Sequence, residues 1–436
     1  MKNQPNKYDG LRSVERRILF TMSKLPSKKK FEKSLRVVGH IIGKYHPYGV
    51  EETYDALARM TRTFSYRYPL VNGQGSFGSI ADPSYVDARF TEVRLSPIGR
   101  LMVENIELCK MVPNYDGFLV EPEFLESRFP NILANGAFND DEFVSLSHNL
   151  HDIYNAVCAV LENPNIDDET LLKVLNGPDF PMGGSVVYDS ELQKAYRGES
   201  AQITIQTRFV EETGDDWKRI VVVGISPLIT MDVLYDELNA AKGKVPGFLG
   251  WYDQTEKNRA RLIIDVALDF DVSEVFENLC KCTSLRKKIK VNQSDDSASF
   301  KELLRSWIKH RMDAIARKAE LDKTKALDRL HRIEYFNKNK IGRILEIISA
   351  ADTYKKMESD LKEAGLDEIQ IDELYKIKMR DINGIKYEIE REYLQKVIAE
   401  CDRILNEEKY REQLLIADLK DLAEKYGDER RTEICY

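Results

Sequence analysis

The sequence lacks any long apolar stretch. None of its 436 residues lies in a run that approaches the ~18 consecutive apolar residues of a membrane-spanning helix. The first residues, Met1 to Pro5, contain no apolar core of a signal peptide. These absences exclude a helical membrane protein and predict a cytoplasmic protein with no membrane partner.

Cysteine is scarce, and its spacing argues against a zinc site. The six cysteines are scattered, and only Cys280 and Cys282 are close, at a spacing too short for a usual zinc knuckle. His148 and His151 are spaced like a metal pair, but no cysteine lies nearby. We therefore predict a reducing compartment and no metal site in this chain.

A nucleotide-binding loop is also missing. The glycine-rich segment GQGSFGS at 73–79 lacks the lysine and the serine or threonine with which a P-loop holds phosphates. No other ATPase motif is visible. We predict no cofactor in this chain, and any use of ATP would belong to a partner subunit.

Positive charge is in deficit overall but concentrated at one end. The formal net charge is -8, yet residues 1–36 hold eleven Lys and Arg against three Asp and Glu, which gives +8 and leaves -16 for the rest. This asymmetry indicates a polyanionic partner on one face. The alternative is a basic N-terminus that is merely solvated.

The periodicity predicts an α+β fold that is mostly helical. Amphipathic helices are expected at 11–22, 31–45 and 52–64, and strands at 201–212, 218–225 and 260–268, with helices at 231–241 and 272–282. Long helices are expected at 300–333 and from about 385 to 425, with shorter helices between them. This pattern favours an antiparallel coiled coil with a globular tip over an ordinary helical bundle. We divide the chain at 1–120, 121–299 and 300–436, with the tip at 337–384.

Eight motifs occur in an order that resembles one family. They are DGLRSVERRILF (9–20), GKYHPYG (43–49), YPLVNGQGSFGS (68–79), ARFTEVRLS (88–96), NYDG (114–117), FPNILANG (129–136), GPDFP (177–181) and YGDERRTEI (426–434). Together they resemble the DNA breakage-reunion core of type IIA topoisomerases, as in gyrase A and the ParC subunit of topoisomerase IV. The resemblance implies a winged-helix domain, a tower-like α/β domain and a coiled coil. Because the sequence ends shortly after the last motif, we expect this chain to lack the family's C-terminal propeller.

The resemblance also implies a chemistry, and one substitution removes it. In the family a tyrosine attacks a DNA phosphate, an adjacent arginine stabilises the charge, and a partner subunit supplies Mg²⁺. Arg89 stands at the arginine position, but Phe90 replaces the tyrosine. Phenylalanine has no hydroxyl, and Tyr85 lies outside the motif position. We therefore expect no cleavage by the family's route.

Further positions of the implied DNA gate are altered. Tyr48 replaces a second histidine, and Glu51 replaces a small hydroxyl residue that faces DNA in relatives. The acidic run Asp140, Asp141 and Glu142 falls where the family has an apolar wedge that bends DNA. Phe138 or Phe143 is the alternative source of a wedge. These joint departures favour a natural, non-cleaving homologue over an engineered tyrosine-to-phenylalanine knock-out.

The resemblance assigns partners and a contact set. The predicted partners are double-stranded DNA, a second copy of the chain in a homodimer, and a gyrase B/ParE-like ATPase whose docking is weakened by a short N-terminal arm. The predicted location is the cytoplasmic nucleoid. The residues expected to contact DNA are Arg12, Arg16, Arg17, Lys33, Arg36, Lys44, His46, Gln74 and Ser76. The alternative for Arg16 and Arg17 is pairing with local acids.

Overall fold

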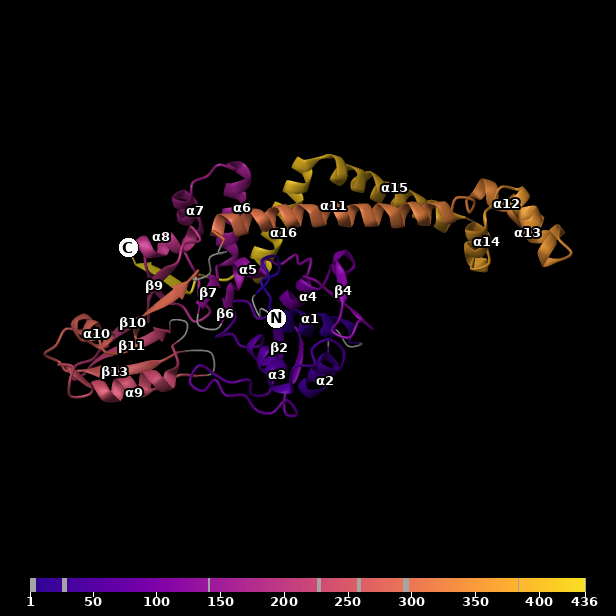
Figure 1. Ribbon diagram of the computed structural model, residues 1–436. Coiled ribbons are helices and arrows are strands. Elements are labelled where there is room, and N and C mark those ends of the chain that lie inside the picture. The colour runs from indigo at the N-terminus through magenta and orange to yellow at the C-terminus, as the bar shows by residue number, and fades with distance from the viewer. Residues whose placement is uncertain are drawn as a thin grey trace. The chain divides into compact units, whose positions relative to one another are not determined.

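The computed structural model describes residues 5–25, 30–139, 142–225, 229–256, 260–292, 298–382 and 384–435 (Figure 1). The chain forms two compact units, Met1–Arg311 together with Ile416–Tyr436, and Met312–Leu415. The fold is α+β, as predicted. Residues 416–436 return to the first unit, where the last strand joins a sheet, and the divisions at 120 and 299 stay predictions.

The N-terminal part of the first unit combines short helices with a small sheet. Helices α1 (Ser13–Lys24), α2 (Ser34–Lys44) and α3 (Val50–Arg59) contact one another. An antiparallel sheet with the order β1 (Glu32–Lys33), β3 (Glu92–Leu95), β2 (Val71–Gln74) accompanies them. The apolar face predicted for the first helix is buried, at Val14, Ile18 and Leu19. The elements that follow are α4 (Pro97–Met102), the 3-10 turn η1 (Ile106–Leu108), the hairpin β4 (Met111–Pro113) and β5 (Val120–Pro122), and α5 (Asn131–Ala134).

A six-stranded sheet gathers strands from distant parts of the sequence. Its order is β15 (Thr432–Cys435), β8 (Gly184–Val187), β9 (Ala201–Gln206), β14 (Arg286–Val291), β7 (Glu142–Ser145), β6 (Ala137–Asn139). The edge strand β15 runs parallel to β8, and β14 runs parallel to β7. Helices α6 (Leu150–Glu162), α7 (Asp168–Leu175) and α8 (Ser190–Tyr196) belong to the same region. The sheet therefore ties the end of the chain to its middle.

A four-stranded antiparallel sheet forms a separate part of this unit. Its order is β10 (Arg208–Thr213), β11 (Lys218–Gly224), β13 (Leu262–Val266), β12 (Phe248–Asp253). Helices α9 (Met231–Ala241) and α10 (Val272–Cys280) share one buried apolar core with it (Figure 1). The segment predicted as one strand at 201–212 is two strands, β9 and β10, which belong to different sheets.

The second unit is helical. Helix α11 (Phe300–Arg332) confirms the predicted long helix and continues from the first unit into the second. The unit then contains α12 (Lys338–Ala350), α13 (Tyr354–Glu363), α14 (Glu368–Leu374), the 3-10 turn η2 (Met379–Asp381) and α15 (Ile385–Asn406). Its core includes Ile333, Phe336 and Leu361, all fully buried.

The predicted helix from about 385 to 425 is interrupted. It consists of α15 and α16 (Glu408–Tyr426), separated by Glu407 in an extended conformation, with φ -111° and ψ 101°. Arg411 donates hydrogen bonds to the carbonyl oxygens of Ile404 (2.7 Å) and Leu405 (3.0 Å) and so satisfies the end of α15. The single-helix prediction was therefore wrong at this one residue. No helix in the described part of the chain is long and apolar enough to cross a membrane.

Candidate functional site

Arg89 and Phe90 lie in an exposed turn that leads into β3. The Phe90 amide donates a hydrogen bond of 2.9 Å to the Asp87 carbonyl, and the Phe90 residue is 68% exposed. The Arg89 guanidinium pairs with the Asp87 carboxylate at 3.2 Å and lies 5.3 Å from the centre of the Phe90 ring. This turn therefore presents an arginine beside a ring that carries no nucleophile.

Tyr85 is the nearest tyrosine in the sequence, and its surroundings do not activate it. Its ring packs edge-on against Tyr54, with centroids 5.0 Å apart. Partial burial and the negative charge of Asp55 raise the pKa of Tyr85, with Arg62 opposing them. An attacking oxygen needs a lowered pKa or an adjacent base. Tyr85 is therefore held in its neutral form and packed against the domain.

The three arginines of the first helical region all have carboxylate partners. Arg16 is buried and binds Asp9 through two nitrogens, at 2.6 and 3.1 Å. Arg17 binds Glu121 in the same two-pronged way, at 2.7 and 2.8 Å, and Arg12 pairs with Glu15 at 3.0 Å. Arg16 and Arg17 thus pair with acids, as the alternative for them describes, and their predicted phosphate contacts stay predictions.

His46 is also internal rather than presented to a ligand. It is 4% exposed, and its Nδ1 accepts a hydrogen bond of 2.9 Å from Arg17. Burial and the charge of Arg17 lower the pKa of His46, against the opposing influence of Glu52 and Glu121. The His46 ring is therefore buried and helps to position Arg17, and its predicted DNA contact stays a prediction.

The remaining predicted DNA contacts lie at the surface. Lys33 pairs with Glu92 at 2.8 Å and Arg36 pairs with Glu32 at 3.1 Å, and both cations are more than half exposed. Lys44 is exposed, and its carbonyl accepts a hydrogen bond of 2.7 Å from Asn114. Gln74 and Ser76 are exposed at the end of β2 and in the loop that follows. These five residues remain accessible to a ligand.

The positions where the sequence departs from the family pattern, Tyr48, Glu51 and 140–142, belong to the first unit. Tyr48 is 53% exposed and packs edge-on against His46, at 4.9 Å between ring centroids. Glu51 is exposed in the first turn of α3, where a carboxylate interacts favourably with the helix dipole. Asp140 and Asp141 lie outside the described residues, and Glu142 begins β7.

Phe138 and Phe143, the alternative sources of a wedge, pack against each other. Their ring centroids are 5.0 Å apart, and Phe143 also lies 6.0 Å from Phe180. Both residues are partly buried, and both line a cavity of about 330 Å³. Neither ring projects as an insertion wedge would.

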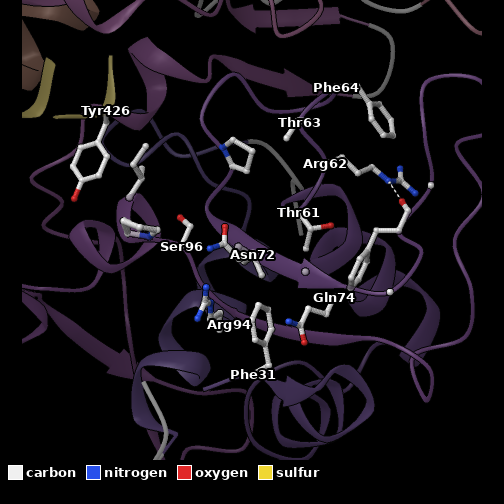
Figure 2. Close-up of a pocket in the computed structure, with 18 residues that line it drawn as sticks. Phe31, Thr61, Arg62, Thr63, Phe64, Asn72, Gln74, Arg94, Ser96 and Tyr426 are labelled. Atoms are coloured by element: carbon white, nitrogen blue, oxygen red, sulfur yellow. Dashed lines mark hydrogen bonds between the residues drawn. The ribbon is translucent and has the colours of Figure 1, made fainter. Parts of the chain in front are cut away.

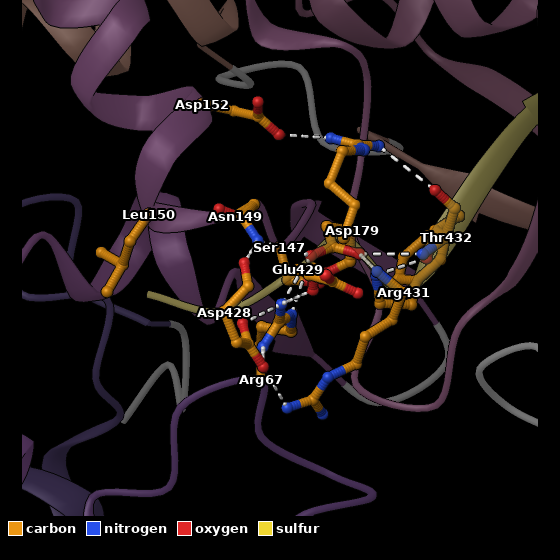
Figure 3. A network of polar contacts seen from close by, with 12 residues as sticks. Arg67, Ser147, Asn149, Leu150, Asp152, Asp179, Asp428, Glu429, Arg431 and Thr432 are labelled. Carbon is orange, nitrogen blue, oxygen red and sulfur yellow. Dashed lines mark hydrogen bonds and ion pairs between the residues drawn. The ribbon is translucent and has the colours of Figure 1, made fainter. Parts of the chain in front are cut away.

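Sequence reasoning missed the role of three motifs that meet at one buried arginine (Figure 3). The Arg67 side chain is fully buried and binds Asp179 at 2.9 Å and Asp428 at 2.5 and 3.1 Å. The Asp179 carboxylate also accepts hydrogen bonds from the backbone amides of Arg431 (2.8 Å) and Thr432 (2.9 Å). The signal was present, since Arg67 precedes one quoted motif and the two acids lie within two others.

Within this network the Asp428 carboxylate keeps its charge at neutral pH. Burial alone would raise the pKa of Asp428, but hydrogen bonds from Arg67 and Arg431 outweigh it and hold the pKa below its usual value. Arg430 adds an ion pair with Asp152 of α6. The network therefore fastens the end of the chain to segments that lie 250 to 360 residues earlier.

His148 has a structural partner on each ring nitrogen. Its Nδ1 donates to the Leu133 carbonyl at 2.7 Å, and its Nε2 accepts from the Tyr196 hydroxyl at 2.9 Å. His151 is exposed. The described residues contain no group of three or more His, Cys, Asp and Glu side chains that could hold a metal ion.

The burial of His148 predicts a pH-dependent stability. Burial lowers the pKa of His148 to about 4. Because an unfolded histidine has a pKa of about 6.5, the unfolded chain binds more protons between these values, and stability falls as the pH falls from 6.5 to 4. The loss is about 3 kcal/mol at most. Urea unfolding followed by the fluorescence of the three tryptophans, which all lie in the first unit, measures it.

A pair of variants assigns this pH dependence. His148→Gln should remove its steepest part in this range, whereas His151→Gln, which changes an exposed ring, should leave it unchanged. A His148→Gln protein with the wild-type slope would show that another group titrates.

Comparison with known proteins assigns the chain to one family. Residues 4–420 match the family of the A-type chains of DNA gyrase and topoisomerase IV. A match of this extent shows that the chain belongs to that family.

Individual relatives agree with this assignment. The chain is 33% identical to DNA gyrase A of Borreliella burgdorferi over 454 aligned positions, which cover 99% of this chain and 56% of that protein. It is 34% identical to DNA gyrase A of Staphylococcus aureus strain NCTC 8325 over 453 positions, which cover 99% and 51%. The chain spans about half the length of the curated relatives it matches.

Proposed function

We propose that this chain forms a homodimeric DNA-gate protein that binds duplex DNA, or a topoisomerase partner, without forming a phosphotyrosyl link. One observation carries the proposal: the motif position of the nucleophile holds Phe90, which is exposed beside Arg89 and has no hydroxyl. The nearest tyrosine, Tyr85, is packed and not activated.

The proposed architecture follows the family. Helices α1 to α3 with the sheet β1-β3-β2 would form the winged-helix domain, and the two larger sheets would form the tower-like domain. Helices α11, α15 and α16 would form the coiled coil, with α12 to α14 at its tip. Mg²⁺ and ATP would be supplied by a gyrase B/ParE-like partner, in the cytoplasmic nucleoid.

The surface cations support weak, salt-sensitive DNA binding. Lys33, Arg36 and Lys44 are exposed and would neutralise phosphates without reading sequence. Two of them already have carboxylate partners, and Glu51 adds an exposed negative charge on α3. A duplex must compete with these carboxylates for the cations. The affinity for DNA and its salt dependence should therefore be lower than those of a protein with about six or more unopposed phosphate contacts.

An exposed apolar face on α15 supports the homodimer. Ile385, Ile389 and Tyr393 recur every four residues and are 46%, 65% and 65% exposed. Residues at this spacing lie on one side of a helix. A contiguous exposed apolar face of this kind marks an interaction site. We assign it to a second copy of the chain.

A second function is an active breakage-reunion enzyme chain that carries a tyrosine-to-phenylalanine knock-out. The observation that favours it is the retained arginine: Arg89 is exposed next to the altered position. Under this alternative, one hydroxyl would restore the enzyme.

The substitution Phe90→Tyr separates the two functions. The variant, mixed with a gyrase B-type ATPase, Mg²⁺, ATP and supercoiled plasmid, is expected to give neither relaxation nor a covalent DNA–protein complex after detergent treatment. The matched control is Phe118→Tyr, which adds a hydroxyl to another exposed phenylalanine. Relaxation by Phe90→Tyr alone would support the active-enzyme alternative and overturn the interpretation of the chain as a natural, non-cleaving homologue.

A further inference from the structure

A cavity of about 650 Å³ lies beside the sheet β1-β3-β2 (Figure 2). Asn72 and Gln74 of β2 line it, together with Arg94 of β3. Asn72 and Arg94 are paired across the two strands, so their side chains lie on one face of the sheet. Phe31 and Tyr426 also line this cavity, which we call the β2–β3 cavity.

The β2–β3 cavity has a positive lining. Its charged lining residues are Arg62 and Arg94, and none of its lining residues is Asp or Glu. This is notable in a chain with 73 acidic residues and a net charge of -8. Glu92, which pairs with Gln74 across the strands, forms its ion pair with Lys33. The lining therefore favours an anionic ligand.

The polar groups of the cavity suit a planar ligand with hydrogen-bonding edges. Within the described residues, neither the Asn72 nor the Gln74 side-chain amide has a hydrogen-bond partner. The Arg94 guanidinium lies 4.3 Å from the centre of the Phe31 ring, and such a stacked pair offers a flat surface. Unpaired amides beside aromatic and guanidinium planes are the groups with which proteins recognise unstacked bases.

One wall of the cavity is held rigidly. Arg62 donates hydrogen bonds of 2.7 Å to the carbonyls of Phe77 and Pro83 and so fixes the loop after β2. That loop continues to the turn with Arg89 and Phe90. These two hydrogen bonds hold the loop in place before any ligand arrives, which lowers the cost of binding.

We propose that the β2–β3 cavity binds one nucleotide unit, a base with its phosphate. The amides of Asn72 and Gln74 bind the base edge, and the base stacks near the Phe31 and Arg94 pair. The guanidinium of Arg62 or of Arg94 binds the phosphate. The source is either a free mononucleotide or a nucleotide turned out of a DNA strand that passes Gln74. This inference goes beyond the proposed function, which requires neither a free mononucleotide nor a nucleotide turned out of the DNA strand.

Two probes test the proposal and distinguish the sources. Isothermal titration of the full chain with dAMP, and separately with inorganic phosphate, detects a free nucleotide. Fluorescence of 2-aminopurine placed in a one-base bulge of a duplex, compared with the paired duplex, detects a nucleotide held outside the helix. Saturable dAMP binding identifies the free source, and a fluorescence change with the bulged duplex alone identifies the DNA source.

Variants locate the binding. The double variant Asn72→Ala and Gln74→Ala is expected to weaken whichever probe binds by about tenfold or more, since two hydrogen bonds are lost. Arg94→Lys keeps the charge, removes the stacked plane and should weaken binding as well. The control Gln202→Ala removes an exposed amide from β9 and should change nothing.

Several results would overturn the proposal. They are no binding of dAMP and no preference for the bulged duplex, phosphate binding as tightly as dAMP, or cavity variants that bind like the wild type. Circular dichroism of each variant checks that it folds. Because these measurements use the unmodified Phe90 chain without a partner, they succeed or fail independently of the relaxation assay.

Discussion

Replacing Arg67 with leucine is expected to lower the free energy of unfolding of the first unit by about 3–5 kcal/mol. The substitution leaves Asp179 fully buried without its cation, and it leaves Asp428 with Arg431 alone. Removing one partner of a buried ion pair costs more than the pair itself contributes, because the remaining charge stays out of water. Urea unfolding followed by tryptophan fluorescence measures the change.

A surface pair provides the control for Arg67. Lys173 and Glu169 form an ion pair of 2.9 Å on α7, and both side chains are more than 60% exposed. Lys173→Ala should therefore cost less than about 0.5 kcal/mol. If Arg67→Leu were equally mild, the network around Arg67 would not be the fastening of the chain end that its geometry indicates.

The second large effect is expected on assembly. The double variant Ile389→Asp and Tyr393→Asp places two charges on the exposed apolar face of α15, where both residues are 65% exposed. If this face is the dimer contact, each loss at its centre costs about 2 kcal/mol or more, which weakens the dimer at least about thirtyfold per residue. Size-exclusion chromatography coupled to light scattering should show that the double variant is a monomer at concentrations where the wild type is a dimer.

The control introduces the same aspartate at an exposed apolar residue of a different helix. Val233 is 51% exposed on α9, a helix of the first unit, and Val233→Asp should leave the mass unchanged. A double variant that stays dimeric, or a wild type that is monomeric, would remove α15 from the proposed interface. Urea unfolding of the variant checks that the loss of the dimer does not follow from a loss of folding.

Local periodicity predicted the elements well where one face of each element is buried. The helix at 300–332 and the strands β11 and β13 were predicted because their apolar residues follow the spacing of a helix or a strand. The prediction failed where the spacing continues through a break. At 201–212 the alternation of apolar and polar residues continues through Thr207. The Thr207 amide instead donates a hydrogen bond of 2.8 Å to the Leu285 carbonyl, and the chain passes from one sheet to another there.

The candidate site was likewise predicted only in part from the sequence. Charge and motif position singled out Arg12, Arg16 and Arg17, because a sequence shows which residues are basic. It does not show that Asp9 and Glu121 lie within 3 Å of two of these guanidiniums. The cavity beside β2 and β3 was not predicted either, since it needs Phe31 and Tyr426 next to Arg94.

The sequence by itself determined that the motif position after Arg89 carries no hydroxyl, because Phe90 lacks one in any conformation. It also determined the family, since motif order survives without coordinates. Only the tertiary structure decided which charges are available. A carboxylate about 100 residues away in sequence, such as Glu121 for Arg17, can neutralise a cation once the chain is folded. Electrostatic availability depends on distance and burial, and both arise only when distant segments pack together.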